Sequence, residues 1–238
     1  MTEVGENFST SGPENHGFSS LNNVFWNLNQ EEIYKIILER GEGKLSKDGA
    51  MVVETGIHTG RSAQDKFVVK ESVNKDAIWW SNAKEMSEDN FDTLYKDMLN
   101  FSIDKDVFVQ DLYGGADLQY RLPTRIYTEY AWHSLFIQNL LITVKEKEKT
   151  DFDPEFVIID LPSFKADPNR HGSRSETVIA VNFAKKIVLI AGTSYAGEIK
   201  KSVFTMLNFL LPPKNVMPMH CSVTVSYTHL TLPTILRV

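Results

Sequence analysis

Apolar residues recur along the chain with spacings that predict several helices. An apolar stripe at Ile33, Ile36 and Ile37 follows Asn29 and stops before Gly41, which indicates a helix with a glycine end. Helical patterns also cover residues 87–100, where Ser87 is suited to the N-cap, and residues 130–142 and 197–211.

Short runs rich in β-branched residues predict strands between these helices. Residues 183–185 join two such runs, which predicts an antiparallel hairpin. Helices mixed with hairpins favour the α/β class, arranged as a mixed α+β lobe rather than as a regularly alternating parallel sheet. The expected strands are residues 51–54, 66–69, 107–109, 156–161, 177–182, 186–191 and 216–221.

The N-terminal residues differ in character from the rest. Residues 1–20 are polar, with few large apolar side chains, so we expect a loose segment that docks only through Phe8 or Phe18. The lobe itself is expected over residues 21–222. The charge run at 145–150 is expected to be a solvated connector.

Composition and charge exclude some classes of function. The 238 residues are 42% hydrophobic and 24% charged, with a formal charge of -6, so a general nucleic-acid binder is not expected. Cys221 is the single cysteine, which favours a reducing compartment. No signal peptide begins the chain, and the longest apolar run, 187–191, is too short for a membrane span. We expect a cytoplasmic monomer with neither a membrane nor a nucleic-acid partner.

A glycine-containing loop at residues 56–62 is the first candidate for chemistry. Gly56 and Gly60 allow a tight turn and a close approach to a ligand. Arg61 offers a planar fork of donors that suits a carboxylate or a phosphate. Taken alone, the loop is more simply a surface hairpin with a solvated arginine.

A second candidate, residues 192–201, joins an expected strand to an expected helix. A helix N-terminus favours anions, and the spacing imitates a phosphate-binding loop. Glu198 stands where that loop needs a lysine, so we reject a nucleotide phosphate loop here. Lys200 and Lys201 lie where positive charge opposes the helix dipole, which indicates either a bound anion or two solvated lysines.

Two further segments are weaker candidates. His220 could ligate a metal, although a lone histidine on a strand is more often a hydrogen-bonded core residue. The donor-rich loop 167–176 could touch a substrate, and its simpler interpretation is a solvated turn. Zinc motifs, an EF-hand and a dinucleotide fingerprint do not occur in the sequence.

Together and in order, several segments resemble the ATP-dependent phosphoenolpyruvate carboxykinases. The resemblance covers residues 22–222 and implies the N-terminal lobe of that fold. The segments that carry it are 58–67, 110–117, 128–136, 192–201 and 219–222.

The resemblance implies a reaction and a set of site residues. Members of the family convert oxaloacetate and ATP into phosphoenolpyruvate, carbon dioxide and ADP, with Mn²⁺ beside a Mg²⁺–nucleotide complex. Arg61 would then hold a substrate carboxylate, and Tyr195 would lie against the substrate. Lys201 and His220 would ligate Mn²⁺ near the transferring phosphoryl group, each as the neutral form.

The sequence departs from the family at two places. Ala63 replaces a common proline, which is minor. After Ser222 the Gly-Lys-Thr phosphate loop, the acidic metal ligand and the distal arginine of the family do not appear. Residues 224–230 match one translated frame of a transposase sequencing adapter, so we expect 223–238 to be a non-native tail.

Three readings of the chain follow from this pattern. The first is a carboxykinase fragment that is inactive alone because it lacks the phosphate loop. The second is a non-catalytic dicarboxylate-binding module that retains Arg61 and Tyr195. The third is a structural fragment that pairs with a separate chain.

Overall fold

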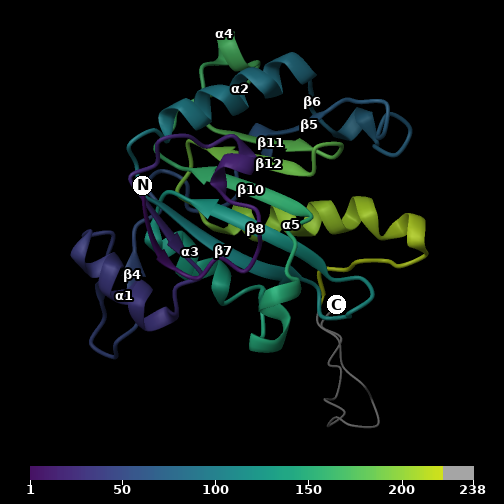
Figure 1. Cartoon of the computed structure of the whole chain (residues 1–238). Coiled ribbons are helices and arrows are strands. Elements are labelled where there is room, and N and C mark those ends of the chain that lie inside the picture. Colours follow the sequence, from purple (N-terminus) through teal and green to yellow (C-terminus); the bar gives the residue numbers. More distant parts are fainter. Residues whose placement is uncertain (222–238) are drawn as a thin grey trace, which may run out of the picture.

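A computed structural model describes residues 1–221 and shows one large mixed sheet with helices on both faces (Figure 1). A two-stranded sheet of β3 (Gly43–Leu45) and β4 (Met51–Val53) lies apart from it. In spatial order the strands of the large sheet are β1 (Thr2–Gly5), β2 (Asn23–Trp26), β7 (Val107–Gly114), β8 (Leu122–Thr128), β10 (Phe156–Leu161), β12 (Ile187–Ala191), β11 (Val178–Asn182), β5 (Lys66–Val69) and β6 (Glu85–Met86), and β9 (Ile142–Thr143) pairs with β7.

The centre of the sheet consists of parallel strands. β8 pairs in parallel with β10, and β10 pairs in parallel with β12. Strands that are buried on both faces are expected to be almost continuously apolar. The sequences of β10 and β12 have this character. Ligand sites in such sheets gather beyond the carboxyl ends of the strands. The turn after β12 is at such an end.

The helices begin and end where local chemistry permits. Asn29 caps α1 (Gln30–Glu39) with a capping box completed by Glu32, and Ser87 caps α2 (Glu88–Phe101). The other helices are α3 (Ala131–Gln138), α4 (Pro168–His171) and α5 (Gly197–Leu210). Short 3₁₀ helices occur at η1 (Pro13–His16), η2 (Ala63–Asp65), η3 (Trp80–Asn82), η4 (Glu146–Asp151) and η5 (Pro212–Lys214).

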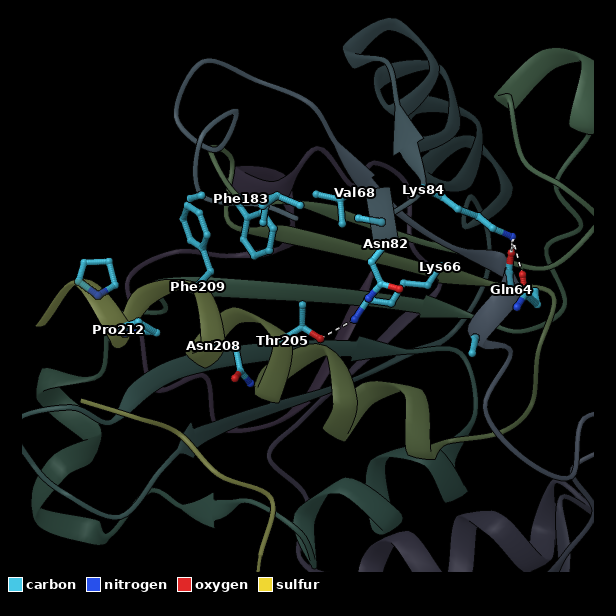
Figure 2. A pocket seen from close by; sticks show the side chains of 15 residues that line it. Gln64, Lys66, Val68, Asn82, Lys84, Phe183, Thr205, Asn208, Phe209 and Pro212 are labelled. Atoms are coloured by element: carbon cyan, nitrogen blue, oxygen red, sulfur yellow. Dashed lines mark hydrogen bonds between the residues drawn. The ribbon is translucent and has the colours of Figure 1, made fainter. Parts of the chain in front are cut away.

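Helix α5 covers one face of the sheet. Its buried residues Ile199, Val203 and Met206 pack with Ile158 of β10 and Val188 of β12. Near its C-terminal end, Phe209 stacks on Phe183 of the β11–β12 hairpin, with ring centroids 4.1 Å apart (Figure 2).

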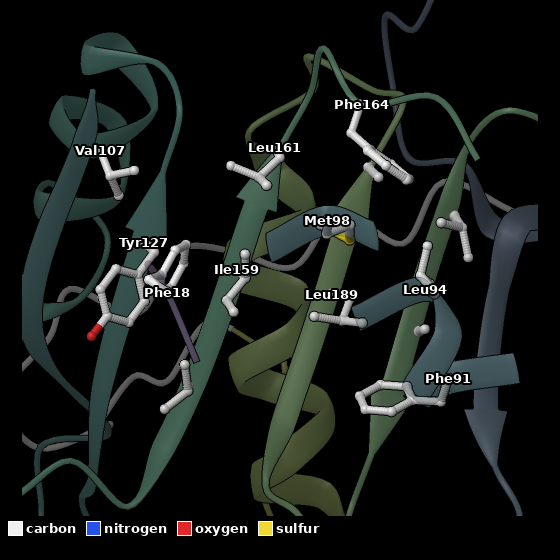
Figure 3. Packing of buried hydrophobic residues seen from close by; sticks show 14 of the residues in the cluster. Phe18, Phe91, Leu94, Met98, Val107, Tyr127, Ile159, Leu161, Phe164 and Leu189 are labelled. Carbon is white, nitrogen blue, oxygen red and sulfur yellow. The ribbon is translucent and has the colours of Figure 1, made fainter. Parts of the chain in front are cut away.

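Helix α2 covers the opposite face. Phe91, Leu94 and Met98 pack over Ile159 and Leu189 (Figure 3). Ile159 and Leu189 directly follow Ile158 and Val188 in their strands. Successive side chains of a strand point to opposite faces, so these neighbours contact opposite helices. The sheet is therefore the shared middle layer of two apolar cores.

Most expected elements agree with the structure, although the strand expected at 107–109 extends to Gly114. The hairpin is confirmed, with β11 antiparallel to β12. The helix expected at 130–142 ends at Gln138, and β9 follows it. The strand expected at 216–221 is wrong for these described residues, which form no strand. Pro218 has no N–H group to donate to a ladder, which explains the failure.

The expectation of a loose segment at residues 1–20 is wrong as well. β1 pairs in parallel with β2, and Phe18 is buried against Tyr127. The polar residues that suggested disorder instead bind Arg125, a fully buried side chain of β8 whose guanidinium donates to Asn7 and Ser11. We refer to residues 7–18 as the N-terminal strap.

Within the described part, no helix combines the length and the apolar character that a membrane crossing requires.

Candidate active site

Two loops that are far apart in the sequence meet at the candidate site. Residues 55–62 precede β5, and residues 192–197 join β12 to α5. The backbone N–H of Ser62 donates to Oε1 of Glu198 at 2.7 Å, and both residues are buried. Glu198 stands where a phosphate loop would need a lysine. In the structure its carboxylate connects the loop of Arg61 to the first turn of α5.

Burial explains the electrostatic character of this contact. Desolvation raises the pKa of Glu198, while the hydrogen bond from Ser62 and the nearby charge of Lys66 lower it. Arg61, the next residue along from Ser62, is exposed, and no acceptor in residues 1–221 binds its guanidinium. The contact fixes the backbone beside Arg61 and leaves its side chain to solvent or to a ligand.

His58 provides a second connection between the same loops. Its Nδ1 lies 3.1 Å from the Ser62 hydroxyl, and its Nε2 lies 3.0 Å from the Thr177 hydroxyl. Thr177 donates its proton to the Gly192 carbonyl at 2.8 Å, so its oxygen accepts from His58 Nε2–H. Nδ1 is then the acceptor for Ser62, which assigns the tautomer.

The loop at 167–176 also contacts this region. Arg174 donates twice to the buried carboxylate of Asp65, at 3.0 and 2.9 Å, and Ser175 donates to it at 2.8 Å. The interpretation of this segment as only a solvated turn is therefore wrong for Arg174 and Ser175. Their contacts hold η2, directly after the loop of Arg61.

Two glycines shape the turn after β12. Gly192 has φ +72°, and a Cβ there would lie 2.2 Å from the carbonyl oxygen of Glu176. A Cβ on Gly197 would lie 2.5 Å from the ring of Tyr195. The ring of Tyr195 thus lies against the first residue of α5, a position that only glycine permits.

A buried histidine lies beneath this turn. His133 of α3 binds Asp160 of β10 through Nδ1 at 2.5 Å and the Ser194 carbonyl through Nε2 at 3.1 Å. A carbonyl can only accept, so Nε2 carries a proton. Burial raises the pKa of Asp160, and the charge of His133 opposes that shift. This pair holds the backbone directly before Tyr195.

Lys201 and His220 each lie near the ring of Phe204. Lys201 Nζ is 5.4 Å from the centroid of the Phe204 ring, and the His220 ring centroid is 5.9 Å from it. His220 is exposed, so the interpretation as a core histidine is wrong. Amine and imidazole nitrogens are ligand types that suit a divalent transition-metal ion. Residues 1–221 contain no cluster of three His, Cys, Asp or Glu that would hold a metal.

Positive charge gathers between the two loops. Burial lowers the pKa of Lys66, Glu198 opposes this shift, and the charges of Arg61 and Lys201 add to it. Arg61, Lys66 and Lys201 therefore share one neighbourhood with Glu198. Such a field favours an anionic ligand.

Comparison with known proteins decides the family. The ATP-type profile described as Phosphoenolpyruvate carboxykinase matches residues 22–232 of the chain. The chain belongs to this family. The mixed α/β fold expected for the N-terminal lobe of phosphoenolpyruvate carboxykinases is confirmed.

Curated carboxykinases give the same result. Phosphoenolpyruvate carboxykinase (ATP) of Parvibaculum lavamentivorans is 57% identical over 94% of this chain and 42% of its own length. The protein of the same name from a Methylobacterium species is 55% identical over the same shares, and that of Mesorhizobium japonicum is 54% identical over 93% and 41%. The chain thus spans about two-fifths of the length of these relatives.

The family match also bears on the expected tail. It includes residues 223–232, which the sequence analysis assigned to a non-native segment. Residues 222–238 lie outside the described part of the structure, and the boundary at 222 remains a prediction.

The carboxykinase resemblance supplied Arg61, Tyr195, Lys201 and His220, and the structure brings the first three to the meeting point of the two loops. It did not supply the residues that hold them. His58 and His133 lie inside segments that carried the resemblance, so their positions were visible. The distant partners Thr177 of His58 and Asp160 of His133 are 119 and 27 positions away along the chain.

Proposed function

We propose that this lobe binds the substrates of a phosphoenolpyruvate carboxykinase: oxaloacetate, which is a dicarboxylate, or phosphoenolpyruvate, which carries one carboxylate and one phosphate. The observation that carries the proposal is the hydrogen bond between Ser62 and Glu198. It links the backbone beside an exposed arginine to the helix that carries Lys201. An arginine fork held beside a lysine is a suitable receptor for a small molecule with two anionic groups.

Each residue has a separate role in this proposal. Arg61 binds one carboxylate with two parallel hydrogen bonds, and Tyr195 lies against the substrate. In the absence of Mn²⁺, the ammonium group of Lys201 neutralises charge on the remaining anionic group. Lys66, half-buried behind them, adds to the positive field without needing contact with the substrate.

The cofactors of the family fit the same end of the sheet. Lys201 and His220 would hold Mn²⁺, which when bound supplies positive charge to the enolate oxygen and the phosphoryl group. Lys201 must be deprotonated and His220 neutral to act as ligands. Mg²⁺ with ATP belongs to the proposed complete reaction, in which oxaloacetate and ATP give phosphoenolpyruvate, carbon dioxide and ADP.

We propose further that the chain by itself forms no phosphoenolpyruvate. Its sequence has no Gly-Lys-Thr phosphate loop, whose backbone N–H groups and lysine position the nucleotide. Dicarboxylate binding without turnover is the alternative function, and the exposed guanidinium of Arg61 favours it for this chain. A monomer in the cytoplasm remains part of the proposal.

Calorimetric titration with oxalate, a stable dicarboxylate, tests the binding function with and without Mn²⁺. We expect Arg61→Lys to weaken binding about tenfold or more, because a lysine cannot replace a bidentate charge-assisted contact worth roughly 1.5–3 kcal/mol. Lys47→Met, which changes an exposed lysine outside the site, serves as the control. Equal oxalate affinity in Arg61→Lys and the wild type would remove Arg61 from the site.

A coupled assay with oxaloacetate, ATP and Mn²⁺ tests the expected inactivity. Turnover by the purified chain that disappears in Lys201→Ala would show that the chain is a complete catalyst.

A further inference from the structure

A cavity of about 600 Å³ lies behind the candidate active site, between α5, β5 and the segment that precedes β6 (Figure 2). This volume is within the range of small-molecule sites. Ala63 and Gln64, directly after the loop of Arg61, form part of its wall. The cavity faces the side of β5 that carries Lys66 and Val68, and neither Arg61, Tyr195, Lys201 nor His220 lines it.

The two ends of the cavity differ in chemistry. Phe183, Phe209 and Pro212 lie toward one end, and Lys84 with Gln64 lies toward the other (Figure 2). The stacked rings of Phe183 and Phe209 provide a flat apolar wall. Such a wall favours a flat, apolar ligand body.

The charged groups of the cavity are of one sign. Lys66 and Lys84 line it, and none of the described residues that line it carries a carboxylate. Lys84 is engaged by the backbone carbonyl and the side-chain carbonyl of Gln64. An anionic group on the ligand is therefore matched by charge on the protein.

Lys66 is the group best placed to receive that anion. Its Nζ donates to the Thr205 hydroxyl at 2.5 Å, and Thr205 donates onward to the Lys201 carbonyl. An ammonium group has three protons, and no second acceptor in residues 1–221 binds Lys66. Two protons thus remain for a ligand or for water.

We propose that this cavity binds an amphipathic carboxylic acid, with its flat apolar body against Phe183 and Phe209 and its carboxylate on Lys66. The site is separate from the dicarboxylate site of the proposed function and does not depend on it. Its ligand would touch the elements that carry both Arg61 and Lys201, since the wall includes Ala63 of η2 and Thr205 of α5.

Calorimetric titration of the full chain with naphthalene-2-carboxylate tests the proposal. We expect saturable binding of one molecule, and at least about tenfold weaker binding of the neutral naphthalene-2-carboxamide, because a charge-assisted hydrogen bond is lost. Lys66→Met keeps the apolar stem of the side chain and should weaken carboxylate binding by a similar factor. The same affinity for the acid and the amide, or no saturation in the millimolar range, would overturn the proposal.

Two further variants separate the cavity from other sites. Asn208→Trp places a large ring in the cavity from an exposed position of α5, so it should abolish binding without loss of a core contact. Lys96→Met, on α2 and away from the cavity, should leave binding unchanged. Persistence of binding in Asn208→Trp would place the acid elsewhere. Loss of binding in Arg61→Lys, or competition by oxalate, would show that the acid occupies the dicarboxylate site instead.

Discussion

Two arginines of this chain have opposite surroundings. Arg125 is fully buried, and its guanidinium makes five hydrogen bonds, to Asp111, Ser11 and Asn7. Arg61 is exposed, and within residues 1–221 no side chain or carbonyl accepts from it. The backbone beside Arg61 is nevertheless fixed by Glu198. A guanidinium whose hydrogen bonds are all made within the protein stabilises the fold. A guanidinium whose backbone is fixed but whose N–H groups have no acceptor is suited to bind an external anion.

The largest effect is expected where the buried arginine is removed. Arg125→Met leaves the fully buried carboxylate of Asp111 without its partner, which should lower the free energy of unfolding by about 3–5 kcal/mol. Urea unfolding measures this change. Arg61→Met is the matched variant, and it should change stability by no more than about 0.5 kcal/mol.

A double variant sharpens the first prediction. Asp111→Leu combined with Arg125→Met removes both charges, so it should recover part of the lost stability. Similar losses for Arg61→Met and Arg125→Met would contradict the distinction between the two arginines.

The next effect concerns the contact that positions Arg61 and rests on the proposed function. Glu198→Ala leaves the buried Ser62 N–H without its acceptor, which costs roughly 1–3 kcal/mol. We expect faster hydrogen exchange at the Ser62 amide and about tenfold weaker oxalate binding. Glu198→Gln keeps a carbonyl oxygen in place and should preserve most of both properties. Unchanged exchange at Ser62 in Glu198→Ala would show that the contact does not hold the loop in solution.

The smallest effect is expected at Asp97, which ties α2 to α4. Its hydrogen bond with Arg170, followed by that with His171, lowers the pKa of Asp97 from 3.8 to about 2. A lowered carboxyl pKa contributes stability above the ordinary pKa and loses it as the pH falls toward the folded value. Asp97→Asn should therefore cost up to about 1 kcal/mol at pH 7. The difference from wild type should shrink between about pH 4 and pH 2.

Urea unfolding down to the lowest pH at which the wild type stays folded measures the Asp97 effect. Asp76→Asn, at an exposed side chain, is the control. A constant difference between Asp97→Asn and wild type over the whole pH range would remove the ionised carboxylate as the cause.

Local signals in the sequence located the capped helices and the hairpin. Ser87 caps its helix as expected, and Asn29 caps the helix that was expected to follow it, because a cap depends only on residues three positions away. Strand β8 was missed because it contains Pro123, Thr124 and Arg125 and so lacks an apolar pattern. The burial of Arg125 in β8 depends on contacts with the N-terminal strap and with Asp111. No local sequence pattern reveals these contacts.

The candidate site shows the same limit. Arg61, Lys201 and His220 were candidates from their own chemistry, whereas their roles, and Tyr195, came from the family resemblance. Glu198 was visible only as a residue wrong for a phosphate loop. Its actual partner, Ser62, is 136 positions away, and such a contact follows from the sheet order rather than from the sequence nearby.

The N-terminal strap has a consequence for the order of events during synthesis. Asn7 and Ser11 leave the ribosome before Arg125, to which they bind and which is 118 and 114 positions later in the chain. Contacts between such distant positions form slowly, because a long loop must close before they stabilise anything. The strap therefore stays undocked until strand β8 has emerged, and over that interval Phe18 is available to chaperones and proteases.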